Sequence, residues 1–433
     1  MITQDKYPNG IIALSSIEMW ERFSFYTMQS ILVLYANAKI LNGGLGWGQA
    51  DALRLTGIYG SLVYMSPLLG GVIADKILGN KVALLLGAII MMFGHISLAF
   101  HSTFSFFLGL ILLIIGSGLL KPTITSMVGE FYTKEDKINK ERAFAFFYMS
   151  INVGAILGTF ISGAIYPKYG YSMAFFVAAF GLIIAIINFL LCRNKSLKNI
   201  GNLKNTTKVN KNKNLSKIEF KKFWVFIALC FSNILWNIIY ALPYGLLTLY
   251  ADKNISKTLM GFNIPTTWFY GMYGIFIIIF SPIMAFFYKF IHNNLKINFT
   301  LSHKLGCAYL FLAIACIFIL PLINQISINH NYVGSPIYLI LFYLFFAISE
   351  LLTIPVLLSA ATTFASKGWS STLVSLNISI SWGVGAYLGG EFGALTETVN
   401  PVFLFKIVII SCFILLIGHI FTNKKIEHLI AQQ

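Results

Sequence analysis

Three ionisable side chains lie close together near the start of the chain, inside an apolar run. Glu18, Glu21 and Arg22 fall within the stretch from Ile11 to Ala38, which otherwise has the composition of a membrane-buried helix. Positions i, i+3 and i+4 share one face of a helix, so the three side chains are predicted to form one polar stripe. A charge at the bilayer centre costs roughly 2.5–3.5 kcal/mol, and such residues usually mark ion or substrate pathways. The stripe therefore indicates transport; the alternative is a salt-bridge cluster that only joins two helices.

Two further charges stand in apolar helices. Lys121 lies in Gly-Ser-Gly-Leu-Leu-Lys-Pro (116–122), and Glu350 is the only acid in the apolar body of the second half. A buried ammonium needs an acidic partner or an anionic ligand such as a substrate carboxylate, unless Lys121 snorkels to an interface. Glu350 would pair with Lys121 to close a gate or accept a substrate ammonium, or serve structural pairing alone. With Arg22, these charges suit a zwitterion with separated ends, such as a small peptide.

The composition is that of a polytopic membrane protein. The chain has 433 residues, 57% of them hydrophobic and 11% charged, against about 25% charged in soluble proteins. Its five cysteines have no metal-ligand spacing, so they are assigned to buried packing. The first apolar run is too long and too charged for a cleavable signal peptide. Twelve runs are long enough to span a bilayer: Ile11–Ala38, Leu53–Ala74, Val82–Phe100, Phe104–Val128, Phe144–Tyr166, Met173–Cys192, Phe223–Tyr250, Trp268–Phe290, Leu305–Ile323, Pro336–Phe364, Leu373–Gly390 and Val402–Phe421.

The distribution of charge decides how the net charge of +16 is interpreted. The basic loops follow spans two, four, eight, ten and twelve, so all of them fall on one side of the membrane. By the positive-inside rule that side is cytoplasmic, both termini lie inside, and the charge does not indicate nucleic acid. The residues are Lys76, Lys81, Lys134, Lys137, Lys140, Arg142, Lys289, Lys296, Lys304, Lys367, Lys424 and Lys425.

The longest connection divides six spans from six. Arg193–Lys222 contains ten Lys or Arg residues and one acid, Glu219, so a disordered cytoplasmic linker is predicted; a basic anchor for anionic lipid headgroups is the alternative. The predicted organisation is an N-terminal bundle (1–192), the linker (193–222) and a C-terminal bundle (223–433). This all-α arrangement of two six-helix bundles fits the major facilitator fold, in which two bundles rock about a central site.

Other candidate residues surround these charges. The loop after span two, Gly-Gly-Val-Ile-Ala-Asp-Lys-Ile-Leu-Gly-Asn-Lys (70–81), resembles the major facilitator loop signature, which assigns a gating role to Asp75, Lys76 and Lys81. Aromatic residues are candidates for amphipathic pocket walls, although each also suits plain packing or an interfacial anchor. They are Tyr26, Tyr35, Tyr59, Tyr64, Tyr148, Trp268 and Trp382.

The same residues carry a resemblance to a family. Tyr-Pro-Asn-Gly (7–10) followed by Glu18-x-x-Glu21-Arg22-Phe23-x-Phe25-Tyr26 resembles the opening of the proton-coupled oligopeptide transporters, within the major facilitators. Residues 116–122, Val-Gly-Glu-Phe-Tyr (128–132) and Phe-Tyr-Met-Ser-Ile-Asn-Val-Gly-Ala (147–155) extend the match, which thins in the second half to short stretches that include Glu350.

The resemblance implies proton-driven uptake of di- and tripeptides. It assigns proton exchange to Glu18, Glu21 and Arg22, and the peptide carboxylate to Arg22 and Lys121. It places Glu350 against the peptide amino group, with Asn152 and Tyr64 as further pocket positions. It implies a monomer in the inner membrane of a bacterium, among membrane lipids, driven by the proton gradient, with no cofactor. The sequence shows no nucleophile–base pair and no zinc spacing such as His-Glu-x-x-His, so neither enzymatic activity nor a metal site is expected.

The chain also departs from the family's pattern. Span seven, Trp236–Gly245, has no acid where the family usually carries one linked to coupling, and Phe25 replaces the first tyrosine of a usual pair. Span eight reads Tyr-Gly-Met-Tyr-Gly (270–274), where the family often has a glutamine and an asparagine. The alternative function is therefore a divergent major facilitator transporter for amino acids or another small organic solute, with altered or lost proton coupling. A receptor that has lost transport is a third possibility.

Overall fold

The computed structural model describes residues 8–132, 137–202, 216–259, 261–296, 299–365 and 370–431. These residues are almost entirely helical, which confirms the predicted all-α class. The long helices are α1 (Asn9–Asn37), α2 (Gln49–Ile73), α3 (Asn80–Leu98), α4 (Thr103–Gly129), α5 (Lys137–Cys192), α6 (Lys217–Ala241), α8 (Thr266–Phe290), α9 (Leu301–Ile328), α10 (Ile337–Thr363) and α13 (Pro401–Ala431). The shorter elements are η1 (Ile40–Asn42), η2 (Ala74–Leu78), η3 (Leu242–Tyr244), α7 (Leu246–Lys253), β1 (Thr258–Leu259), β2 (Phe262–Asn263), η4 (Ile291–Leu295), α11 (Ser370–Asn377), η5 (Ile378–Gly383) and α12 (Val384–Leu395).

The described helices account for the twelve predicted spans. Nine helical stretches are long and apolar enough to cross a membrane. One of them, Arg142–Cys192, has 51 residues, about twice the length that one span needs. It is broken at Gly170, whose φ of 81° and ψ of 169° are not helical, so α5 supplies spans five and six. The charged helix α1 supplies span one, and the interrupted stretch from α11 to α12 supplies span eleven, which completes the twelve spans.

Spans seven and eleven are interrupted, which the sequence patterns did not predict. In span seven, α6 ends at Ala241, a short 3-10 turn contains Pro243, and α7 starts after Gly245. Proline lacks the N–H group that an α-helix needs at an interior position, which accounts for a break there. In span eleven, the π-helical η5 joins α11 to α12. A two-residue antiparallel pairing of β1 with β2 is the only strand structure in the described part of the chain.

The chain divides into two compact units. Unit 1 comprises Met1–Trp47 and Leu62–Val209, and unit 2 comprises Gly48–Ser61 and Asn210–Gln433. The beginning of α2 thus groups with unit 2, where a Cβ on Gly57 would lie 2.7 Å from Cα of Gly390. The division at 1–192, 193–222 and 223–433 remains a prediction.

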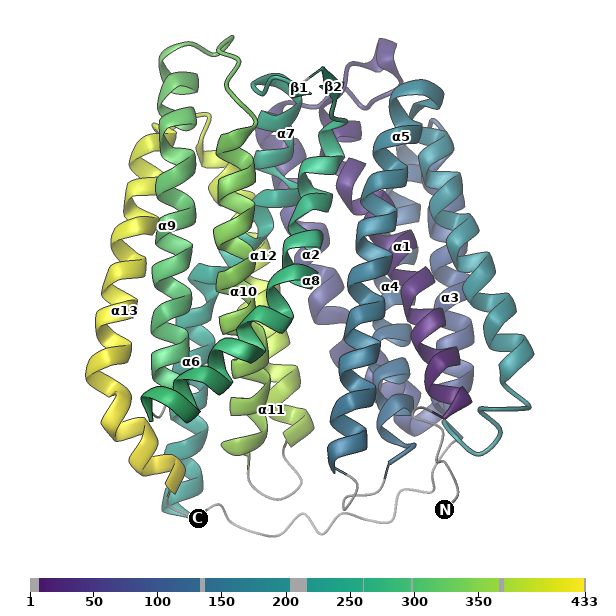
Figure 1. Ribbon diagram of the computed structural model, residues 1–433. Coiled ribbons are helices and arrows are strands. Elements are labelled where there is room, and N and C mark those ends of the chain that lie inside the picture. Colours follow the sequence, from purple (N-terminus) through teal and green to yellow (C-terminus); the bar gives the residue numbers. More distant parts are fainter. Residues whose placement is uncertain are drawn as a thin grey trace. The chain divides into compact units, whose positions relative to one another are not determined.

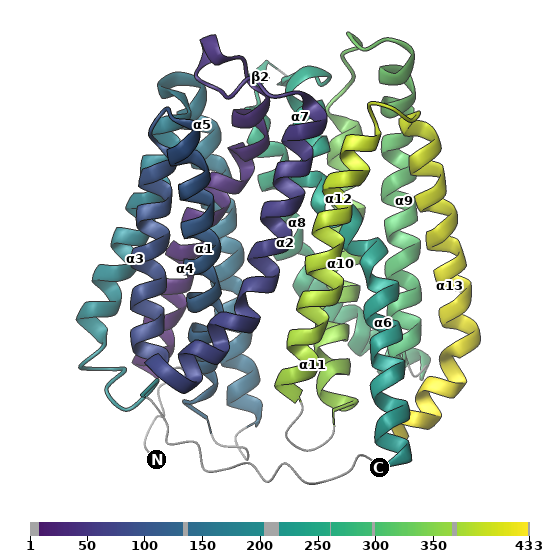
Figure 2. The same cartoon turned by 180° about the vertical axis from the view of Figure 1, so that it is seen from behind.

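Within each unit the long helices pack side by side. In unit 1, α1 lies along α5, and α3 packs on both α4 and α5 (Figure 1). In unit 2, α9 lies between α10 and α13, while α6 packs on α12 (Figure 2). These contacts bury one side of each helix and leave many apolar side chains exposed on the others, which suits a lipid environment.

The predicted linker is structured at its C-terminal end, contrary to the expectation of disorder through Lys222. Ser216 and Glu219 form a capping box: the Ser216 hydroxyl accepts from the Glu219 N–H at 3.2 Å, and the Glu219 carboxylate accepts from the Ser216 N–H at 2.8 Å. Such reciprocal bonds satisfy two N–H groups at a helix start, so α6 begins at Lys217. The central part of the predicted linker, residues 203–215, lies outside the described residues, as do Lys134 and Lys367.

Candidate functional site

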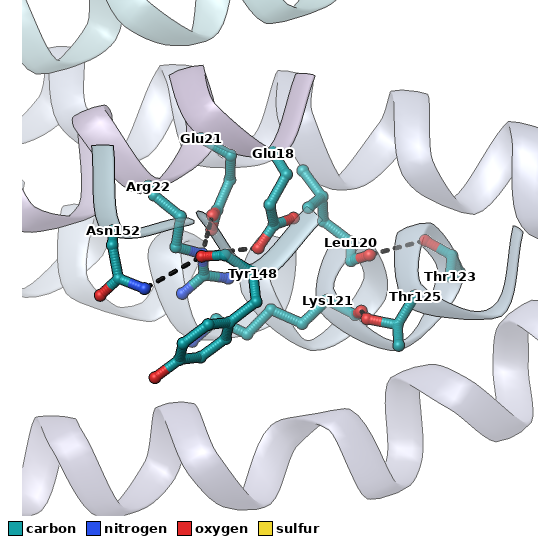
Figure 3. Close-up of polar contacts among 9 residues, drawn as sticks. All are labelled: Glu18, Glu21, Arg22, Leu120, Lys121, Thr123, Thr125, Tyr148 and Asn152. Carbon is teal, nitrogen blue, oxygen red and sulfur yellow. Dashed lines mark hydrogen bonds and ion pairs between the residues drawn. The ribbon is translucent and has the colours of Figure 1, made fainter. Parts of the chain in front are cut away.

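The charged stripe of α1 forms a buried ion-pair cluster. The Nε atom of Arg22 lies 2.8 Å from Oε1 of Glu18 and 2.6 Å from Oε2 of Glu21. The exposed fractions of Glu18, Glu21 and Arg22 are 2%, 0% and 9%. The predicted stripe therefore exists, and both acids contact Arg22 directly (Figure 3).

Both acids of this cluster have buried oxygens without a hydrogen-bond donor among the described residues. They are Oε2 of Glu18 and both carboxylate oxygens of Glu21; Oε2 of Glu21 has the ion-pair contact with Arg22 but no hydrogen bond. A buried carboxylate oxygen without a donor is costly when the group is ionised. Adding a proton removes the charge, so these oxygens are natural positions for a bound proton.

Lys121 of α4 brings a second cation to the cluster. It interacts electrostatically with all three charged residues of α1. Figure 3 shows its side chain extending from α4 toward Arg22. The Nζ atom lies 4.6 Å from the centre of the Phe25 ring and 5.4 Å from that of Tyr64. Rings at these distances stabilise an ammonium through their negative faces. An anionic ligand would thus find two cations, Arg22 and Lys121, in one place.

Polar side chains of α1 and α5 accompany this cluster in unit 1. Asn152 is 8% exposed, and its Nδ2 donates to the backbone oxygen of Tyr148 at 3.0 Å, one turn earlier in α5 (Figure 3). Tyr26 is half-buried, and the ring of Phe25 stands edge-on to it at 5.2 Å. Asn152, Tyr26 and Tyr64 thus occupy unit 1 with the charged residues.

Close contacts between α1 and α5 set the position of the charged stripe. A Cβ on Gly154 would lie 2.2 Å from the backbone oxygen of Met19, and one on Gly158 would lie 2.5 Å from that of Phe23. Thr27 adds a hydrogen bond to the Gly158 oxygen at 3.3 Å. Small residues let two helices approach closely in a membrane. The backbone that carries Glu18 to Arg22 is therefore held directly against α5.

Unit 2 holds the remaining predicted substrate residues. Glu350 is 5% exposed, in α10. Its neighbour Ser349 accepts a hydrogen bond from the indole of Trp236 at 2.9 Å and donates to the Ala308 oxygen at 2.8 Å. This bridge links α6, α9 and α10 at the level of Glu350. Trp268 is half-buried, with its ring 5.9 Å from that of Phe262.

The gating residues predicted in the loop after span two lie near the ends of helices in unit 1. Asp75 and Lys76 are exposed in η2. Lys81, in the first turn of α3, donates from Nζ to the Lys198 oxygen at 2.7 Å and to Oδ1 of Asn202 at 3.1 Å. Lys81 therefore fastens the start of α3 to the segment after α5, a contact that the sequence did not predict.

Two further contacts do not follow from the sequence pattern. Phe25 stands where the family usually has a tyrosine, and its ring faces the Lys121 ammonium. Ser349 and Trp236 lie 113 positions apart, and no local spacing connects them. The occurrence of Ser349 beside the single acid of the second half is the one signal that would have singled it out.

Comparison with known proteins adds three likenesses and a family match. The model of the POT family matches residues 81–215 and 194–403. The uncharacterized transporter YclF of Bacillus subtilis (strain 168) is 30% identical, over 91% of this chain and 90% of that protein. A di-/tripeptide transporter of Lactococcus lactis subsp. lactis (strain IL1403) is 40% identical over 45% of this chain and 39% of its own length. The crystal structure of a peptide transporter POT in complex with alafosfalin superimposes with a TM-score of 0.88 and 27% identity, covering 98% of this chain and 96% of the other.

Proposed function

Because the chain belongs to the POT family of proton-coupled oligopeptide transporters within the major facilitator superfamily, we propose that it is a symporter that imports di- and tripeptides by alternating access. The observation that carries this proposal is the cluster of Glu18, Glu21 and Arg22, buried in α1 with Lys121 beside it. The Lactococcus di-/tripeptide transporter, 40% identical over 45% of this chain, supports the same substrate class.

The cluster gives a physical route from proton binding to substrate binding. When Glu18 or Glu21 takes up a proton, Arg22 loses part of its ionic partner and becomes available to a peptide carboxylate. Lys121 supplies a second cation for the same carboxylate, while Glu350 receives the peptide amino group. A proton drives such a cycle only if it binds the two states of the carrier with different affinity, and exchange of partners at Arg22 provides that difference.

The remaining elements of the proposal concern the setting of this site. Tyr26, Tyr64, Asn152 and Trp268 contribute to the pocket, and Asp75, Lys76 and Lys81 take part in gating together with Lys121 and Glu350. The transporter works as a monomer in the inner membrane of a bacterium, with both termini in the cytoplasm. The proton gradient is its driving force, and no cofactor takes part.

Uptake into proteoliposomes under an imposed pH gradient, acidic outside, tests the proposal. The wild-type protein is expected to accumulate labelled dipeptides. Glu21→Gln is expected to abolish accumulation but to retain exchange of labelled for unlabelled peptide, because an amide at this position cannot take up and release a proton as a carboxylate does. Glu397→Gln, which removes an exposed acid, serves as the matched control. Absence of uptake across a varied peptide panel would exclude peptide transport.

A second candidate function rests on span seven. No acid lies between Glu219 and Asp252, so this span offers no carboxylate for coupling or for a peptide ammonium. A transporter of amino acids or another small organic solute, with altered coupling, would fit that observation. Competition in the same vesicles separates the two candidates: uptake of an amino acid that no di- or tripeptide inhibits would favour the second.

A further inference from the structure

A pocket with two cations opens in unit 1 where α3 begins and α5 ends. Its volume is about 400 Å³, and Lys81, Arg193 and Asn202 line its polar side. Pockets of about 300–1,000 Å³ are typical of small-molecule sites. This end of unit 1 is the one that the sequence predicts to face the cytoplasm. None of the charged residues of α1 lines this pocket. Lys81 is also one of the proposed gating residues, whereas Arg193 has no place in the proposed transport cycle.

The two cations of this pocket are incompletely neutralised. Lys81 uses two of its three N–H donors, on the Lys198 oxygen and on Asn202, and one donor is left. The Arg193 guanidinium is exposed and makes no hydrogen bond or ion pair with the residues that the structure describes. The charges of Lys81 and Arg193 repel each other. An anion between them would relieve this repulsion.

No acid is among the residues that line the pocket, and the one acid that acts on Lys81 has other partners. Glu130 attracts Lys81, but its Oε2 accepts from the N–H of Gly201 at 2.9 Å and its Oε1 accepts from Asn80 at 3.5 Å. A single carboxylate balances one of the two cations at most. The pocket therefore keeps a net positive charge among the described residues.

The other side of the pocket is apolar and continues along the outside of α3. Val82 and Leu86 line the pocket and are 47% and 39% exposed, and Phe93 is 54% exposed farther along the same helix. From Val82 to Phe93 the helix rises about 16 Å, which is comparable to the length of an acyl chain. Such a stripe on a membrane-spanning helix faces hydrocarbon.

We propose that this pocket binds an anionic phospholipid. The phosphate of the headgroup lies between Lys81 and Arg193, and an acyl chain follows Val82, Leu86 and Phe93. Basic pockets between membrane helices on the cytoplasmic side are suited to anionic headgroups. The cations and the apolar stripe meet in one pocket, which favours a lipid over a free phosphate ion.

Lipid titration of the purified full-length protein in detergent tests this site without any measurement of transport. The melting temperature is followed by tryptophan fluorescence while phosphatidylglycerol, phosphatidylcholine with the same acyl chains, or inorganic phosphate is added. We expect phosphatidylglycerol to raise the melting temperature and the other two to leave it unchanged. Arg193→Gln is expected to weaken the apparent affinity about fivefold.

Lys195→Gln is the matched control, because it removes one exposed positive charge two residues from Arg193 without touching the pocket. It is expected to retain wild-type affinity. An equal loss in both variants would show diffuse attraction to anionic lipid and overturn the site. An equal response to phosphatidylcholine would overturn the role of the headgroup charge, and an equal response to phosphate would assign the pocket to a free anion.

Discussion

At the scale of single residues, Arg22 is the group on which both buried acids of α1 depend. Its Nε atom lies within 2.8 Å of one carboxylate and 2.6 Å of the other. The hydrogen bond from Nε goes to Glu18, while Glu21 makes the shorter ion-pair contact. Protonation of either acid therefore weakens one of the two ion pairs of the same guanidinium. The positive charge of Arg22 is then less neutralised and more available to a ligand.

Loss of Arg22 is predicted to destabilise the protein more than loss of either acid. Arg22→Gln leaves two buried carboxylates without their shared cation, at a cost of about 3–5 kcal/mol. Glu21→Gln leaves Arg22 paired with Glu18 and is expected to cost less. Melting temperatures of the purified variants at neutral pH measure the order. Acidification should restore part of the loss in Arg22→Gln, because protonated carboxyl groups carry no charge; equal stability of the two variants would contradict the shared pairing.

Lys121 is predicted to act on the carboxylate end of the substrate. Lys121→Gln should raise the KM for a dipeptide about tenfold or more, because a hydrogen bond to a charged group contributes about 1.5–3 kcal/mol. A dipeptide amide, which has no terminal carboxylate, should show the same KM in both proteins. Lys304→Gln is the control, because it removes another lysine next to an aromatic ring, in unit 2. The Nζ atom of Lys304 lies 4.9 Å from the centre of the Tyr288 ring. An equal rise for both substrates would remove Lys121 from carboxylate binding.

The residues of the α1 cluster could be predicted from sequence because helix geometry alone places i, i+3 and i+4 together. The contact of Phe25 with Lys121 could not, since it depends on how α4 packs against α1. The bridge from Trp236 through Ser349 to Ala308 has the same origin. Contacts within one helix follow from its 3.6-residue period and can be predicted from sequence spacing. Contacts between helices depend on how the helices pack.

At the scale of elements, the pairing of α1 with α5 holds the charged stripe in place. Gly154 and Gly158 are one turn apart in α5, and both lie against the backbone of α1. Hydrogen bonds between Thr27 and Gly158, and between Ser30 and Ser162 at 2.8 Å, extend the same contact. The helix that carries the charged stripe is thereby positioned by glycine contacts and by hydrogen bonds between uncharged groups.

Gly154→Ala is predicted to disturb this surface. The added Cβ would meet the Met19 oxygen at 2.2 Å, so the helices must separate, and a loss of about 1–3 kcal/mol is expected, as for other overpacked contacts. Gly418→Ala is the control, because nothing lies within 4 Å of its Cβ position and alanine favours helix by up to about 1 kcal/mol. Melting temperatures should fall for the first variant and stay level or rise for the second; a fall in both would refute a local clash.

The helices themselves were predicted well, but their interruptions were not. Hydropathy reports the length of an apolar run, and the breaks in spans seven and eleven fall inside such runs. Pro243 signals the first break. The π-helical turn η5 lies in a stretch without proline. Its Ser381 donates a hydrogen bond to the Cys230 oxygen of α6 at 3.0 Å, a contact between helices that the local sequence does not reveal.

At the scale of the whole molecule, the two units differ in their chemistry. Unit 1 buries two acids in contact with Arg22, and Lys121 interacts electrostatically with all three. In unit 2, Glu350 is the one buried acid among the described residues, next to a Trp236–Ser349 bridge and a set of stacked aromatic rings. Sequence predicted this asymmetry from the positions of the charges alone. It could not supply the placement of one unit against the other, because no local pattern encodes it.

This asymmetry predicts a division of labour between proton coupling and recognition of the amino group. Glu350→Gln should raise the KM for free dipeptides about tenfold and leave an N-acetylated dipeptide unaffected, because only the former carries an ammonium. The Glu350→Gln variant should still accumulate dipeptide under a pH gradient when the peptide concentration is high. Glu21→Gln should do the reverse, with accumulation lost for both substrates and peptide exchange retained. If Glu350→Gln abolished pH-driven accumulation at unchanged KM, the coupling would run through unit 2, and the α1 cluster would lose its assigned role.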